Sequence, residues 1–138
     1  MQNGEAINYV LDCFALFAYF ADEPGGVKVK DLIVKARNNE IILFVSVINL
    51  GELFYMMCKK RNRARADEIL GDVKKLPITI VSVTDEQVFK AAILKSNNSI
   101  SFSDAFAASL SFEVKAPLVT GDPEFRNMND KISLFWLL

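Results

Sequence analysis

Four carboxylates stand out as the residues of this chain best suited to chemistry. Asp12 interrupts an apolar stretch, and Glu52 is flanked by leucine and phenylalanine, whereas Asp104 and Asp122 lie in the last third of the sequence. Burying a carboxylate costs several kcal/mol unless a partner compensates for its charge. A divalent cation shared by all four acids would supply that compensation, and a bound divalent cation can activate a water molecule for hydrolysis.

Histidine is absent from the sequence. This absence excludes Ser-His-Asp and Cys-His nucleophilic sites, acid–base catalysis by imidazole, and the usual histidine-containing zinc and iron sites. A metal would therefore be held by oxygen atoms, which favours Mg²⁺ or Mn²⁺.

The elements that must position the acids form an alternating pattern. Short apolar runs of strand length recur along the chain, and amphipathic stretches with helical spacing separate them. This alternation predicts one α/β domain over residues 1–138, an α/β/α sandwich around a mainly parallel sheet of about five strands. The strands are expected at residues 7–11, 41–45, 78–81, 117–120 and 132–137.

The expected strands would bring the acids together. In an open α/β sheet, ligands bind outside the carboxyl ends of the strands. Asp12 and Asp122 each follow a predicted strand, and Glu52 and Asp104 fall in early turns of predicted helices. Each close pair of carboxylates costs about 4 kcal/mol at an effective dielectric constant near 20, and helix N-termini offset only part of this. We therefore expect a cation among them.

Each acid taken alone also has a purely structural interpretation, which the sequence leaves open. A carboxylate near a helix start often caps the helix or completes a capping box. Asp12 and Asp122 could each occupy a cap or turn position. Glu52 could be the capping-box partner of Asn49, and Asp104 that of Ser101.

Four motifs in order along the chain carry a resemblance to a known family: Val10-Leu11-Asp12, residues 46–53, Ser103-Asp104-Ala105 and residues 118–125. Together they resemble the PIN-domain nucleases, and in particular the single-domain VapC toxins of toxin–antitoxin pairs. The resemblance implies an Mg²⁺- or Mn²⁺-dependent endoribonuclease in which Asp12, Glu52, Asp104 and Asp122 are the catalytic residues and metal ligands. It also implies an RNA substrate, an antitoxin protein partner and a homodimer.

Cys13 departs from the family pattern, in which threonine or serine usually follows the first aspartate. A hydroxyl group near the metal is therefore missing. This departure keeps open an alternative function, a PIN-like module with weak or no catalysis that acts through a protein or RNA partner. Thr120 offers a hydroxyl that either supports the metal site or packs within its strand.

A phosphoacceptor receiver domain is a third hypothesis, because such domains also gather acids around Mg²⁺ at strand ends. That class needs a second acid beside the first strand and a lysine after a late strand. Neither Asp12 nor the segment 117–120 supplies this arrangement.

Charge and cysteine content indicate the compartment and the partners. Once four carboxylates are set aside, the formal charge of −1 becomes +3, and five cations crowd residues 59–65. This segment either contacts RNA phosphates or forms a solvated helix end.

Cys13 and Cys58 fit free thiols in a reducing compartment, and no apolar run is long enough to span a bilayer. We expect a cytoplasmic protein without a membrane partner.

Overall fold

The central element of the computed structural model is a five-stranded sheet in the order β3-β2-β1-β4-β5. The structure describes residues 7–128 and 131–138, and every strand pairing within them is parallel. The strands are β1 (Asn8–Leu11), β2 (Ile42–Ser46), β3 (Ile78–Val81), β4 (Leu118–Thr120) and β5 (Leu134–Trp136). The predicted parallel α/β sheet is confirmed.

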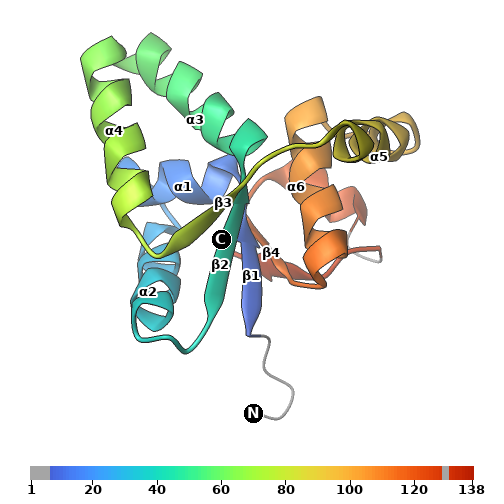
Figure 1. The fold of residues 1–138 in the computed structure, drawn as a ribbon, viewed down its shortest axis with the longest axis horizontal. Coiled ribbons are helices and arrows are strands. Elements are labelled where there is room, and N and C mark those ends of the chain that lie inside the picture. The colour runs from blue at the N-terminus through green and yellow to red at the C-terminus, as the bar shows by residue number, and fades with distance from the viewer. Residues whose placement is uncertain (1–6, 129–130) are drawn as a thin grey trace.

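Within the described residues, six α-helices cover the two faces of the sheet (Figure 1). One side carries α1 (Cys13–Phe20), α2 (Gly26–Arg37), α3 (Val47–Lys60) and α4 (Arg63–Lys75), and the other carries α5 (Asp85–Ser96) and α6 (Phe102–Val114). A separate hydrophobic cluster fills each interface. Successive residues of β1 serve the two clusters, since Leu11 packs on the α1–α4 side and Val10 on the α5–α6 side. This alternation is why the two consecutive residues Val10 and Leu11 are both apolar.

Polar residues at the helix starts fix where the helices begin. The Ser46 hydroxyl accepts a hydrogen bond from the Ile48 N–H at 3.2 Å, and Thr84 and Gln87 form a capping box at the start of α5. Because Ser46 caps α3, the helix already contains Asn49. The sequence interpretation of Glu52 as a capping-box partner of Asn49 is therefore wrong.

The remaining differences lie at element ends. Asp122 was interpreted as a cap or turn residue, and a strand was expected over residues 132–137. In the structure a 3₁₀-helix, η1 (Pro123–Met128), follows β4, and β5 is limited to Leu134–Trp136. Residues 1–6 and 129–130 of the predicted domain lie outside the described residues.

The connections reverse direction at the centre of the sheet. From β1 the chain proceeds outward to β2 and β3, whereas β4 returns to the opposite edge of β1 and β5 follows it. The carboxyl ends of β1 and β4 therefore form a topological switch point, the usual ligand-binding position in open α/β sheets. Among the described residues, no helix is long and apolar enough to cross a membrane.

Candidate metal centre

Asp12 lies at this switch point, between the end of β1 and the first turn of α1. Its Oδ1 accepts a hydrogen bond from the Ala15 N–H at 2.9 Å, and its Oδ2 accepts one from the Thr120 hydroxyl. Asp12 is therefore a helix cap, as one interpretation held, but it is also only 1% exposed. Burial raises the pKa of Asp12 to about 7, although both hydrogen bonds act in the opposite direction.

Thr120 connects the acids of the two central strands. Its side chain is fully buried at the end of β4. The hydroxyl donates to Asp12 and accepts a hydrogen bond from the Asp122 N–H at 3.0 Å. Thr120 therefore orients the carboxylate of Asp12 and the backbone that carries Asp122.

Three carboxylates form a compact group beside Asp12 and Thr120. Oxygen atoms of Asp104, Asp122 and Glu124 all lie within 4.8 Å of one another. Asp104 comes from the first turn of α6, Asp122 from the segment after β4, and Glu124 from η1. Burial raises the pKa of Asp104 to about 9, and its hydrogen bond to Glu124 and the nearby negative charges add to the shift.

Glu124 is a candidate site residue that sequence reasoning missed. Its Oε1 accepts a hydrogen bond from the Ser101 N–H at 3.0 Å, while the Ser101 hydroxyl accepts one from the Asp104 N–H at 3.1 Å. Glu124 thus satisfies the Ser101 N–H, the group that Asp104 was expected to bind in a capping box. Its position two residues after Asp122 was the available signal.

Glu52 approaches the site from α3, on the opposite side of the sheet from α6. Its Oε1 accepts a hydrogen bond from the Ser103 hydroxyl at 2.9 Å, and Ser103 directly precedes Asp104. The Asn49 side chain strengthens this link, because its Nδ2 donates to the Ser103 carbonyl at 3.0 Å. Glu52 is not a member of the three-carboxylate group, but its negative charge contributes to the raised pKa of Asp12.

Cys13 is buried beside these acids. Its Sγ lies 3.5 Å from Met56 Sδ, and burial raises the pKa of the thiol. The side chain therefore remains a neutral thiol directed toward a thioether at the position where a hydroxyl was expected.

The donor set fits a hard divalent ion. Every side chain of the three-carboxylate group supplies oxygen, and oxygen ligands are those that Mg²⁺ and Mn²⁺ prefer. The raised pKa values of Asp12 and Asp104 show that their negative charges are disfavoured without an added cation.

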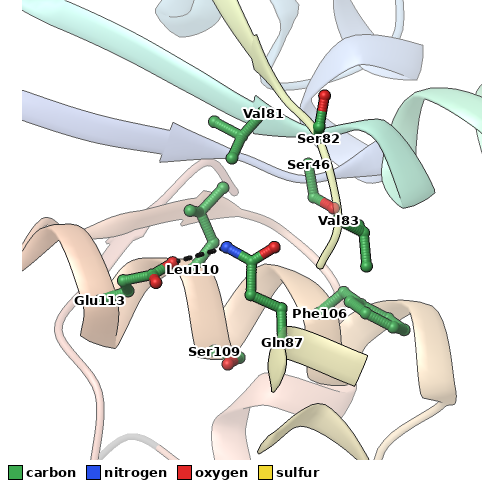
Figure 2. Close-up of a pocket in the computed structure, with 9 residues that line it drawn as sticks. All are labelled: Ser46, Val81, Ser82, Val83, Gln87, Phe106, Ser109, Leu110 and Glu113. Atoms are coloured by element: carbon green, nitrogen blue, oxygen red, sulfur yellow. Dashed lines mark hydrogen bonds between the residues drawn. The ribbon is translucent and has the colours of Figure 1, made fainter. Parts of the chain in front are cut away.

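One pocket of the protein lies away from these acids. Figure 2 shows a small pocket between the end of β3 and helices α5 and α6. The Gln87 Nε2 donates to Glu113 Oε2 across it at 2.9 Å. None of the predicted acids lines this pocket, so it is not part of the candidate centre.

The basic segment 59–65 lies at the junction of α3 and α4, and several of its charges have partners. The Arg63 Nε is 3.0 Å from an Asp67 oxygen, and Arg65 pairs with Glu68. The ammonium of Lys60 also lies 5.3 Å from the Phe17 ring centroid. These contacts give Lys60, Arg63 and Arg65 a structural role.

Comparison with known proteins links this geometry to one family. The sequence description of the PIN domain matches residues 9–131. No curated protein sequence matches the chain significantly.

Solved structures share the fold. VapBC from Salmonella typhimurium, bound to DNA, has a TM-score of 0.71 at 14% identity, over 96% of this chain and 99% of that chain. VapC20 from Mycobacterium tuberculosis, a toxin that cleaves the sarcin–ricin loop, has a TM-score of 0.70 at 14% identity, over 90% and 95%. VapBC2 from Rickettsia felis, bound to promoter DNA, has a TM-score of 0.67 at 21% identity, over 91% and 96%.

The family match spans β1 to η1 and therefore covers all five carboxylates of the candidate centre. The sheet order and the acids at its switch point are consistent with that match. The chain belongs to the PIN-domain family.

Proposed function

We propose that this protein is a metal-dependent endoribonuclease that hydrolyses RNA phosphodiester bonds. The observation that carries the proposal is the group of Asp104, Asp122 and Glu124, whose oxygens lie within 4.8 Å of one another next to buried Asp12. Membership of the PIN-domain family supports it. Within this proposal Asp12, Glu52, Asp104 and Asp122 are the catalytic residues, and Glu124 joins them.

The same acids would hold Mg²⁺ or Mn²⁺, either directly or through water. When bound, such an ion lowers the pKa of a coordinated water and stabilises negative charge on the phosphate and the leaving oxygen. Thr120 holds the Asp12 carboxylate in place, and Ser103 holds that of Glu52. Rigid support of this kind is what a metal site requires of the residues around its ligands.

Partners follow from the same proposal. The similar structures from Rickettsia felis and Salmonella typhimurium are VapBC proteins, and VapC20 is a toxin that cleaves the sarcin–ricin loop. We propose that this chain is likewise the toxin of a toxin–antitoxin pair, that it acts in the cytoplasm as a homodimer, and that an antitoxin protein inhibits it.

RNA cleavage tests the proposal directly. Purified protein is incubated with single-stranded RNA with Mg²⁺, with Mn²⁺ or with a chelator, as wild type and as Asp12→Asn. We expect cleavage only by the wild type with metal. Asp31→Asn on the exposed face of α2 is the matched control and should cleave normally. Equal cleavage by all variants under all conditions would contradict the proposal.

The second candidate function is a binding module without catalysis, and the partly buried contact between Cys13 and Met56 favours it. Cys13→Thr restores the hydroxyl usual in the family. If only Cys13→Thr cleaves RNA while the wild type binds it, the module is the correct function.

A further inference from the structure

A second concave site lies at the outer edge of the sheet, beside β5. Arg126, Leu134, Trp136 and Leu138 line an open pocket there. The Arg126 guanidinium lies over the Trp136 indole, 4.7 Å from the ring centroid. An exposed cation stacked on a half-buried aromatic ring is thus available to a ligand from solvent.

This pocket is next to the acidic centre. Trp136 is the register partner of Thr120, whose hydroxyl binds Asp12. Neighbouring strands lie about 4.8 Å apart, so the Trp136 backbone is one strand from the end of β4. Arg126 also belongs to η1, the same short helix that contains Glu124.

The charge beside Trp136 is positive, whereas the centre itself is negative. Arg126 covers the indole, and Lys28 Nζ reaches the Trp136 carbonyl oxygen at 3.4 Å. A polyanion that must approach five carboxylates needs cations close by to hold its phosphates. Proteins bind single-stranded RNA by combining such cations with aromatic or guanidinium planes on which bases stack.

We propose that Trp136 and Arg126 form a nucleotide-binding subsite for single-stranded RNA, in which a base stacks on the indole–guanidinium pair and a neighbouring phosphate contacts Arg126. The inference rests on the proposed ribonuclease function and adds the residues that hold the substrate. Stacking tolerates every base, so the subsite selects unpaired nucleotides without reading their sequence.

An apolar peptide is the competing occupant, because Leu134 and Leu138 also line the pocket. RNA is favoured by the stacked guanidinium, by Lys28 and by the position one strand from the proposed centre. The experiment therefore includes a peptide.

Trp136 is the single tryptophan of the chain and so reports on its own environment. The full chain is titrated with a short single-stranded RNA, with Ca²⁺ replacing Mg²⁺ to suppress cleavage, and tryptophan emission is followed. We expect saturable quenching by RNA and much less by an abasic ribose-phosphate oligomer of equal charge. An apolar peptide should leave the emission unchanged.

Binding of labelled RNA, measured by anisotropy, completes the test. Trp136→Ala should weaken binding about 5- to 150-fold, the range measured for loss of one stacked base, and Trp136→Phe should recover most of it. Arg126→Ala should weaken binding and reduce its salt dependence. Phe89→Ala removes an aromatic ring that is 68% exposed on α5 and should bind as the wild type does.

The outcomes separate the two proposals. RNA binding without quenching of Trp136 emission, wild-type affinity in a folded Trp136→Ala variant, or quenching by the peptide but not by RNA would overturn the subsite. If quenching occurs and Mg²⁺-dependent cleavage does not, the subsite stands and the ribonuclease function fails. If Mg²⁺-dependent cleavage occurs without quenching, the ribonuclease function stands and the subsite fails.

Discussion

The acidic centre and the basic segment 59–65 hold charge in opposite ways. At the centre, Asp12 is 1% exposed and Asp104 is 6% exposed, and each has a raised pKa. In the basic segment, Arg63 and Arg65 are ion-paired within α4 to Asp67 and Glu68. One region gathers like charges out of water, whereas the other pairs opposite charges in water.

This difference separates a candidate ligand site from an ordinary charged surface. Exposed ion pairs within one helix need nothing further and contribute little to stability. Buried like charges are costly unless a ligand neutralises them or they bind protons. Charges crowd together in both regions. Among the described residues, however, the buried acids Asp12 and Asp104 form no ion pair with lysine or arginine, whereas Arg63 and Arg65 each pair with an acid.

Thr120 offers the largest effect predicted for a residue that is not itself an acid. Thr120→Val removes the hydroxyl that Asp12 and the Asp122 N–H share, so Mg²⁺-dependent cleavage should fall about 10- to 100-fold. Thr120→Ser keeps the hydroxyl and should stay near wild type in the same assay. A valine variant as active as the serine variant would mean that this bridge does not support the centre.

Glu124 should matter next. Glu124→Gln removes one carboxylate of the three within 4.8 Å and should weaken Mg²⁺ binding about tenfold, as measured by calorimetry. Glu113→Gln, an exposed change on α6, is the control and should leave the affinity unchanged. If both variants bind Mg²⁺ as the wild type does, Glu124 lies outside the metal site.

A change of pH should shift the melting temperature of the metal-free protein by several degrees. In the native state the pKa values of Asp12 and Asp104 are raised from 3.8 to about 7 and about 9, so the folded protein binds more protons than the unfolded chain between these limits. The metal-free melting temperature should therefore fall as the pH rises from about 4 to about 9. Melts of the wild type and of Asp104→Asn measure this slope, which should be shallower in the variant.

Loss of an ion pair in the basic segment should have the smallest effect on the protein, a nearly unchanged melting temperature. Asp67→Asn breaks the exposed pair with Arg63, and the melting temperature should barely change. A large drop in thermal melts, comparable to that of a core substitution, would remove the contrast between the two regions.

Much of this architecture was readable from the sequence because local signals agreed with it. Apolar runs marked all five strands, and Ser46 and Thr84 are residue types that favour the N-cap positions they occupy. The 3₁₀-helix η1 was missed, since Pro123 and Asp122 also suit a simple turn. Its absence from the prediction explains why Glu124 was overlooked as a neighbour of Asp104.

The contacts between distant acids depended on packing that no local pattern encodes. The bridge from Thr120 to Asp12 joins residues 108 positions apart, and the bond from Ser103 to Glu52 joins residues 51 apart. The sequence predicted that these acids would share one edge of the sheet. It could not predict which hydroxyl holds which carboxylate.

Calorimetry of Mg²⁺ binding at pH 7, in buffers of different ionisation enthalpy, tests the central claim most directly. The raised pKa of Asp104, about 9, means that the metal-free centre holds a proton at this pH, which the cation must displace. We predict that the wild type binds Mg²⁺ and releases protons, and that Asp104→Asn binds more weakly and releases fewer. Absence of Mg²⁺ binding by the wild type, or binding of equal strength and equal proton release in Asp104→Asn, would contradict the account.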